Sequence, residues 1–177
     1  PFTAALDAIE AFPWPTVAAM NGHCLVVALE MAVTCDLRVS APRAKMGMPP
    51  AKLGLIYGHT GLIRFARTIG LPRTRELFFT GDMMSAERAD GIGLVNRVLE
   101  GEFQVESVSF AAGIAANAPL SMRGNKQIID TITGNPVLSD EQVAELVGLR
   151  ESCFASEDFL EGITAFGEKR KPNWTGR

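Results

Sequence analysis

The sequence is poor in cysteine, tyrosine and histidine, and it has no surplus of positive charge. Its three cysteines (Cys24, Cys35 and Cys153) are far apart and form no CxxC pair, which suits a reducing compartment and argues against a zinc site. The 17 basic residues against 20 acidic ones argue against a nucleic-acid binder that works by bulk attraction to phosphate. No apolar run reaches the ~18 residues that a membrane-spanning helix needs. We therefore expect a cytoplasmic protein that contacts neither nucleic acid nor a membrane and holds no metal.

The order of apolar runs predicts an α/β fold. The chain has 177 residues, 47% of them hydrophobic, which is enough for one or two compact domains. It begins Pro1-Phe2-Thr3 and then has the pattern of the end of a helix over 4–12, so we expect an N-terminal part to be missing. Short apolar runs predict strands over 16–20, 37–40, 44–48 and 94–99, with helices over 25–34, 59–69, 74–80 and 86–90 and a Pro- and Gly-rich loop over 49–58. The rest is helical, which indicates a βα core followed by a helical C-terminal subdomain.

Three serines stand where helix N-caps are expected. Ser85 precedes a first turn that contains a glutamate, Ser139-x-x-Gln142 is a capping-box pattern, and Ser156 precedes two acidic residues. We predict that a helix begins directly after each of these serines.

Glu30 is the one charged residue in the most apolar stretch of the chain, residues 26–33. A helix that is apolar on all sides is normally buried, so an inward Glu30 would be a carboxyl group shielded from water and suited to general acid/base work. The alternative is a structural Glu30 that lies at the surface or pairs with an arginine.

Further candidates lie in turns and loops. The Asn21-Gly22 turn leads to a helix start, whose free N–H groups can hold an oxyanion, and His23 stands beside it.

Tyr57 can donate a hydrogen bond to a carboxylate or carbonyl, or it can be a packing residue. Asp36 is expected to cap backbone N–H groups at the next turn. The cations 169–171 stabilise the end of the last helix or bind a phosphate-bearing ligand.

In one order along the chain, several segments resemble the crotonase (enoyl-CoA hydratase/isomerase) superfamily. They are Pro15–Gly22, Glu30, Cys35–Ala41, Leu53-Gly54, Gly61–Phe65, Thr80-Gly81, Ser85-Ala86, Ala89–Asn96 and Phe166–Pro172. The resemblance covers essentially the whole chain.

The resemblance implies a spiral of ββα units over residues 1–100 and a helical oligomerisation subdomain over 101–177, which assembles homotrimers or hexamers. It also implies an acyl-CoA thioester as substrate, with no permanently bound cofactor. The thioester enolate would be met by two backbone N–H groups, one of them from Val27 and the other from an upstream Ala-Gly-x-Asp type loop that these residues do not contain. Glu30 and Tyr57 would be the catalytic residues. The positions implied to bind substrate or coenzyme A are His23, Val26, Pro50, Lys169 and Lys171.

Two departures from the family pattern affect the expected chemistry. Val26-Val27-Ala28 replaces three glycines, and β-branched residues resist unusual backbone angles, although the N–H of Val27 survives the change. Pro50 stands where hydratases have a second glutamate, which argues against hydration by paired carboxylates.

Residues 48–57, 156–162 and 169–174 are similar to the methylmalonyl-CoA decarboxylase branch of the superfamily, which also lacks the second glutamate and has a tyrosine in this loop. This similarity implies a lyase or an isomerase. Loss of CO2 would give the enolate directly, with Tyr57 orienting the carboxylate, whereas double-bond isomerisation would use Glu30 as a proton shuttle. The alternative is a non-catalytic crotonase paralogue that binds coenzyme A or forms oligomers.

Overall fold

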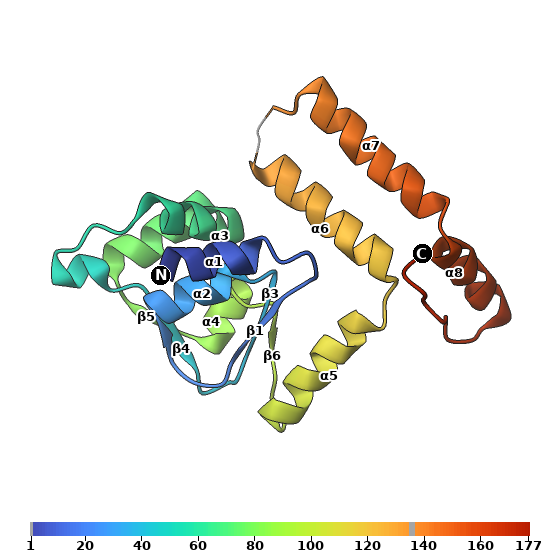
Figure 1. The fold of residues 1–177 in the computed structure, drawn as a ribbon. Coiled ribbons are helices and arrows are strands. Elements are labelled where there is room, and N and C mark those ends of the chain that lie inside the picture. The colour runs from blue at the N-terminus through green and yellow to red at the C-terminus, as the bar shows by residue number, and fades with distance from the viewer. Residues whose placement is uncertain (1, 135–136) are drawn as a thin grey trace. The chain divides into compact units, whose positions relative to one another are not determined.

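The computed structural model describes residues 2–134 and 137–177 (Figure 1). The chain forms two compact units, and each is described by itself. The first unit contains the residues up to Phe12 and Thr16–Ala111, and the second contains Pro13–Pro15 and Ala112–Arg177. The units divide inside helix α5 (Phe103–Ala115). The boundary between residues 100 and 101 that the family resemblance implies stays a prediction.

The first unit alternates short strands with helices. In chain order its elements before α5 are α1 (Phe2–Glu10), β1 (Val17–Met20), β2 (Cys24–Leu25), α2 (Val27–Thr34), β3 (Leu37–Ser40), β4 (Lys45–Gly47), the 3-10 helix η1 (Pro50–Leu53), α3 (His59–Thr80), β5 (Met83–Ser85), α4 (Ala86–Gly91) and β6 (Arg97–Val98). The α/β organisation expected from the sequence is therefore present.

The strands form two small sheets. One has the order β1-β3-β6 and is parallel, with Val17 opposite Leu37 and Val39 opposite Arg97. The other has the order β2-β4-β5, in which β2 and β4 are parallel and β4 and β5 antiparallel. Asp36 stabilises the first sheet, because its Oδ2 accepts hydrogen bonds from the backbone N–H of Thr16 (2.6 Å) and from the Thr16 hydroxyl (2.8 Å). Its structural role is confirmed, but the N–H that it caps belongs to Thr16, directly before β1, and not to the next turn.

Helix α2 lies in the middle of the first unit. It packs against α1, α3 and strands β1, β2 and β3 (Figure 1). Its Leu29 belongs to the same core cluster as Met46 of β4 and Phe65 of α3, and all three side chains are fully buried. Because neighbours enclose this helix on several sides, a charged residue within it needs partners that the protein itself supplies.

Several element boundaries differ from those predicted. The helix predicted to begin at residue 25 begins at Val27, because Cys24 and Leu25 pair with β4. The predicted helices 59–69 and 74–80 form the single element α3, which is interrupted at Gly70 (φ 71°). The predicted strand 94–99 pairs only over Arg97–Val98. Strand β5 was not predicted, because its partner β4 is distant in the sequence, and the 3-10 helix η1 lies in the segment expected to be a loop.

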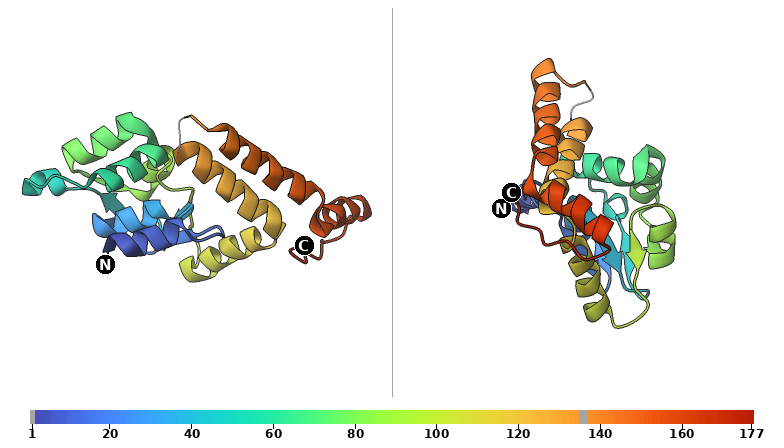
Figure 2. Two further views of the ribbon diagram at one scale, coloured as in Figure 1. Left: turned by 45° about the horizontal axis from the view of Figure 1, so that its top comes forward. Right: turned by 90° about the vertical axis from the view of Figure 1, so that its right-hand side faces the viewer.

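The second unit is helical. After α5 it contains α6 (Pro119–Gly134), α7 (Asp140–Phe154) and α8 (Glu157–Glu168), and α6 and α7 lie side by side in both views of Figure 2. All three predicted serine N-caps are confirmed: Ser85 begins α4 in the first unit, Ser139 forms the full capping box of α7, and Ser156 begins α8. Within residues 2–134 and 137–177, no helix combines the length and apolarity needed to cross a membrane.

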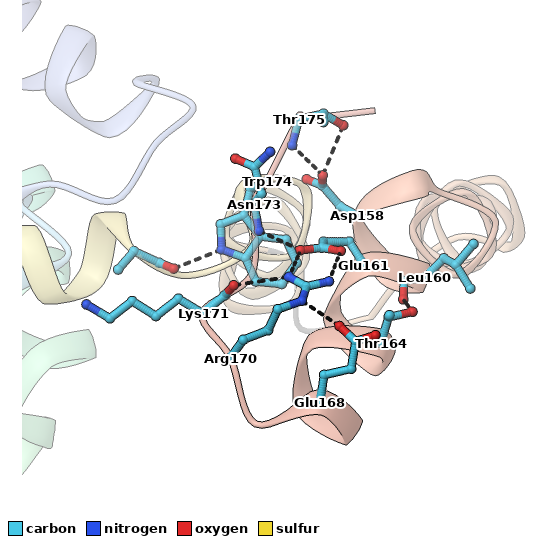
Figure 3. A network of polar contacts seen from close by, with 11 residues as sticks. Asp158, Leu160, Glu161, Thr164, Glu168, Arg170, Lys171, Asn173, Trp174 and Thr175 are labelled. Carbon is cyan, nitrogen blue, oxygen red and sulfur yellow. Dashed lines mark hydrogen bonds and ion pairs between the residues drawn. The ribbon is translucent and has the colours of Figure 1, made fainter.

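The C-terminal tail folds back onto α8 (Figure 3). The buried Asp158 carboxylate accepts hydrogen bonds from the backbone N–H groups of Thr175 (2.7 Å) and Gly176 (3.0 Å). Arg170 forms a forked pair with Glu161 (2.6 and 2.9 Å), and this pair lowers the pKa of Glu161 to about 2. The tail is therefore held at both ends by charge-assisted hydrogen bonds.

Candidate active site

Glu30 lies inward on α2 with only 6% of its surface exposed. Its Oε1 accepts a hydrogen bond from Arg64 Nη1 at 3.1 Å, and its Oε2 accepts one from the Tyr57 hydroxyl at 2.5 Å. Features of both interpretations drawn from the sequence are therefore present, since the carboxylate is buried and it also pairs with an arginine. The partners satisfy both carboxylate oxygens, as a buried charge requires.

Tyr57 reaches Glu30 from the loop that precedes α3. Its ring is half-buried and tilted against Phe78, with 5.4 Å between the ring centroids. Burial raises the pKa of the Tyr57 phenol, and the hydrogen bond to Glu30 and the charge of Glu30 raise it further. The phenol therefore keeps its proton and acts as the donor in the pair. The structure brings together the two residues that the sequence singled out as catalytic.

The close approach of Tyr57 depends on a glycine. A Cβ at Gly61 would lie 2.5 Å from Tyr57 Cε1 and 2.9 Å from Glu30 Oε1, both too close for real atoms. Gly61 thus leaves the space on α3 in which the phenol and the carboxylate meet.

Arg64 is the member of this cluster that the sequence analysis did not assign. Its guanidinium, 7% exposed, also binds Glu10 of α1 through Nε (2.9 Å) and Nη2 (2.8 Å), and Nη2 lies 3.4 Å from Asp7 Oδ1. The hydrogen bond from Arg64 lowers the pKa of Glu10. The spacing along the helix is the one sequence signal that pointed to Arg64. Residues three apart lie on the same face of a helix, and Arg64 is three residues after Gly61 and directly before Phe65, both of which are buried.

The start of α2 has an unusual backbone. Val26 adopts φ 48° and ψ −109°, values that β-branched residues rarely take. Its N–H donates to the Gly47 carbonyl (3.2 Å), and its carbonyl accepts from Glu30 N–H (2.9 Å). The chain therefore passes from strand β2 to helix α2 at this one residue, which forces the positive φ. The resistance expected of the valines does not prevent this geometry.

Val27 is the first residue of α2, and its side chain is 49% exposed. Among the described residues its backbone N–H has no acceptor, as is usual in the first turn of a helix. Such an N–H, at the positive end of the helix dipole, can hold an oxyanion.

A pair of substitutions at position 26 tests the backbone strain. Val26→Gly and Val26→Ala both remove the isopropyl group, but only glycine adopts a positive φ freely. We expect the glycine variant to be the more stable of the two by about 1 kcal/mol, the reverse of the usual order. Urea unfolding of both variants measures the difference, and an alanine variant of equal or greater stability would contradict the strain.

A hollow of about 460 Å³ in the first unit is lined by β1, the Asn21-Gly22 turn and one face of α2. His23 lines this hollow and is exposed. The thiol of Cys24 also lines it, and burial raises the pKa of that thiol to about 11, so it stays protonated. The implied substrate-binding role of His23 stays a prediction, although its position beside a hollow is consistent with it.

Pro50 is buried at the first position of η1, where a proline fits because no helical N–H is needed. The position of the expected second glutamate therefore carries no acid or base. Across the described residues, no group of three or more His, Cys, Asp or Glu side chains could hold a metal ion.

Lys169 and Lys171 belong to the second unit, and both are exposed. Lys169 ends α8 with φ 55°, and the ammonium group of Lys171 points away from the polar network in Figure 3. Arg170 between them is already engaged by Glu161 and Glu168. The implied role of Lys169 and Lys171 in binding substrate or coenzyme A stays a prediction.

The buried Glu30 carboxylate on α2 meets the Tyr57 phenol, and these two groups form a polar site inside an α/β core. The sequence model of the enoyl-CoA hydratase/isomerase family matches residues 1–177. The chain is 36% identical to the human enoyl-CoA hydratase domain-containing protein 2, mitochondrial, over 97% of this chain and 60% of that protein. It is 39% identical to a short-chain-enoyl-CoA hydratase of Clostridioides difficile, over 85% of this chain and 96% of that protein.

Solved structures agree. An enoyl-CoA hydratase/carnithine racemase from Magnetospirillum magneticum matches with a TM-score of 0.90 and 34% identity, over 99% of this chain and 64% of that one. The chain belongs to the enoyl-CoA hydratase/isomerase family, and its fold is crotonase-like. It spans about 60% of the length of the human relative.

Proposed function

We propose that the complete protein containing this chain acts on an acyl-CoA thioester and stabilises its enolate, as an isomerase or a decarboxylase rather than a paired-carboxylate hydratase. The observation that carries the proposal is the 2.5 Å hydrogen bond from Tyr57 to the buried Glu30. This polar pair contains one carboxylate, and Pro50 occupies the position of the expected second one. The Val27 N–H would donate to the thioester oxygen, with His23, Val26, Pro50, Lys169 and Lys171 binding substrate and coenzyme A.

Double-bond isomerisation is the activity that the geometry supports best. It needs one base that removes a proton from the substrate and returns it to another carbon. Glu30 suits this task because its carboxylate is buried and oriented, with Arg64 donating to Oε1 and Tyr57 to Oε2. Coenzyme A would enter as part of the substrate, with no resident cofactor.

Decarboxylation is the second candidate, supported by the position of Tyr57. Loss of CO2 leaves the electron pair on the α-carbon and needs no base, so a structurally paired Glu30 is compatible with it. The similarity of residues 48–57 to the methylmalonyl-CoA decarboxylase branch also favours this reaction. It requires the Tyr57 hydroxyl to turn from Glu30 to the substrate carboxylate, because a phenol has one proton to donate.

Three assays on the complete protein separate these activities from hydration, the reaction in the names of several relatives. A 3-enoyl-CoA reports isomerisation by the gain of conjugated enoyl absorbance, crotonyl-CoA reports hydration by its loss, and methylmalonyl-CoA reports decarboxylation by CO2 release. We expect isomerisation or decarboxylation to exceed hydration. Faster hydration overturns the proposal, and coenzyme A binding without any turnover favours the non-catalytic paralogue.

Tyr57→Phe distinguishes the two preferred reactions. The variant keeps the ring against Phe78 and removes only the hydroxyl. We expect decarboxylation to fall by about a hundredfold, since its carboxylate would lose the group that orients it, and isomerisation by a few fold. Rates of both reactions in one preparation provide the measurement, and an equal loss of both contradicts the role given to the phenol.

Assembly into homotrimers or hexamers is part of the proposal. It is supported by the apolar side chains that α8 exposes, among them Leu160 (66%), Ile163 (58%) and Phe166 (88%). A cytoplasmic location stays an expectation of the sequence, and the curated relatives include proteins named as mitochondrial.

A further inference from the structure

The Arg64 guanidinium is held in one orientation by two helices. It projects from α3, and Nε and Nη2 form a fork with the two Glu10 oxygens of α1 at 2.9 and 2.8 Å. A forked arginine–carboxylate pair fixes the guanidinium plane as well as its position. Nη1 is left to point at Glu30 Oε1, at 3.1 Å.

The two ends of this pairing differ in burial. The side chains of Arg64 and Glu30 are each 7% exposed, whereas Glu10 is 42% exposed and Asp7 is 63% exposed. An exposed carboxylate keeps its charge in water without help, but a buried one needs a cation or a hydrogen-bond donor. Arg64 therefore matters most to Glu30, while Glu10 serves to hold Arg64.

We propose that Arg64 is a positioning residue for Glu30, which it orients toward Tyr57, and that Glu10 holds Arg64 in place. The chain of contacts runs from α1 through α3 to α2 and ends at the phenol. This inference rests on the proposed function and deepens it. It assigns to Arg64, and to Glu10 of α1 behind it, the orientation of the carboxylate that moves the proton.

The contacts around Glu30 set the expected effects of substitution. Tyr57 faces it from the loop before α3 and Arg64 faces it from α3, with Glu10 and Asp7 of α1 behind the guanidinium. Removing the guanidinium takes away the donor that holds Glu30 Oε1. Removing the Glu10 carboxylate takes away the fork that fixes the guanidinium, so it weakens the same positioning in part.

The test compares Arg64→Gln, Glu10→Gln and the control Arg73→Gln, which removes a guanidinium that binds Glu76 on the same helix. In Arg64→Gln we expect kcat for isomerisation to fall by about a hundredfold with a smaller change in KM. In Glu10→Gln we expect kcat to fall by a few fold, because the guanidinium loses the fork that fixes it, and in Arg73→Gln kcat should stay. If Arg64→Gln does not fold, Glu10→Gln carries the test, because its side chain is partly exposed.

A readout without turnover separates this inference from the proposed function. Tyr57 is the one tyrosine of the chain, so a ¹³C label at tyrosine Cζ gives a resonance that Tyr57→Phe identifies. That resonance reports the hydrogen bond from the phenol to the Glu30 carboxylate, and its chemical shift should change in Arg64→Gln, change less in Glu10→Gln and stay in Arg73→Gln. Unchanged shifts in the first two variants overturn the positioning role, whatever the activity. Changed shifts in a protein that neither isomerises nor decarboxylates overturn the proposed function and leave the positioning role standing.

Discussion

Replacing Glu30 with glutamine is expected to lower isomerisation by about 10²- to 10⁴-fold, the usual contribution of a positioned general base. Glutamine has nearly the same shape, and its carbonyl oxygen can still accept the hydrogen bond from Tyr57. It cannot take up a proton from the substrate. The loss should therefore lie in kcat, measured with a 3-enoyl-CoA on the complete protein.

Decarboxylation by the same variant should fall by less than tenfold, because the CO2-releasing step requires no base. Circular dichroism and urea unfolding show whether Glu30→Gln is folded, and Glu76→Gln, which removes an exposed carboxylate on α3, is the matched control. A Glu30→Gln enzyme that isomerises at the normal rate would remove Glu30 from the mechanism. Equal losses of both activities would instead indicate that Glu30 acts by holding the site together.

The sequence predicted those features that depend on neighbouring residues. Ser85, Ser139 and Ser156 each accept a hydrogen bond from an N–H three residues further along, so a local pattern suffices to find them. The apolar residues around Glu30 indicated burial as one of two interpretations, and only the structure shows that it is both buried and paired with an arginine. The fold class followed from the alternation of strand and helix patterns, and the family from the order of its segments.

The sequence could not predict partners that are distant along the chain. Glu30 pairs with Tyr57 and Arg64, which are 27 and 34 residues away, and Arg64 pairs with Glu10 across 54 residues. Charges on a helix usually face solvent, and only the packed structure shows that Arg64 does not. For the same reason the sequence could not separate Arg170, bound to Glu161, from the lysines on either side of it.

The short strands were missed on similar grounds. Cys24 and Leu25 continue directly into an apolar helix, and their strand partners, Met46 and Gly47, lie 22 residues further along the chain. The positive φ of Val26 follows from that pairing. A residue that resists this conformation therefore occupies the junction at which the proposed oxyanion donor, Val27, begins its helix.

A second large effect is expected from the smallest change in the site. Gly61→Ala adds one methyl group at a point 2.5 Å from Tyr57 Cε1 and 2.9 Å from Glu30 Oε1. The ring cannot remain where it is, so the hydrogen bond between Tyr57 and Glu30 should be lost. Overpacking of this kind destabilises a folded protein by roughly 1–3 kcal/mol. We expect that loss in urea unfolding, together with a fall in isomerisation of about tenfold or more, larger than in Tyr57→Phe because the added methyl group also displaces the Glu30 carboxylate.

Gly58→Ala is the matched control, three residues earlier and at the N-cap of α3. A Cβ there meets nothing within 4 Å, and its φ of −63° suits any residue. Alanine restricts the unfolded chain but caps a helix less well than glycine, so the two effects roughly offset and stability should stay within about 1 kcal/mol of the original. If both alanines behave alike, Gly61 does not set the approach of Tyr57, and the phenol must reach the carboxylate by another route. A defect confined to Gly61→Ala shows instead that the space on α3 is what allows the single tyrosine and the buried carboxylate to act as a pair.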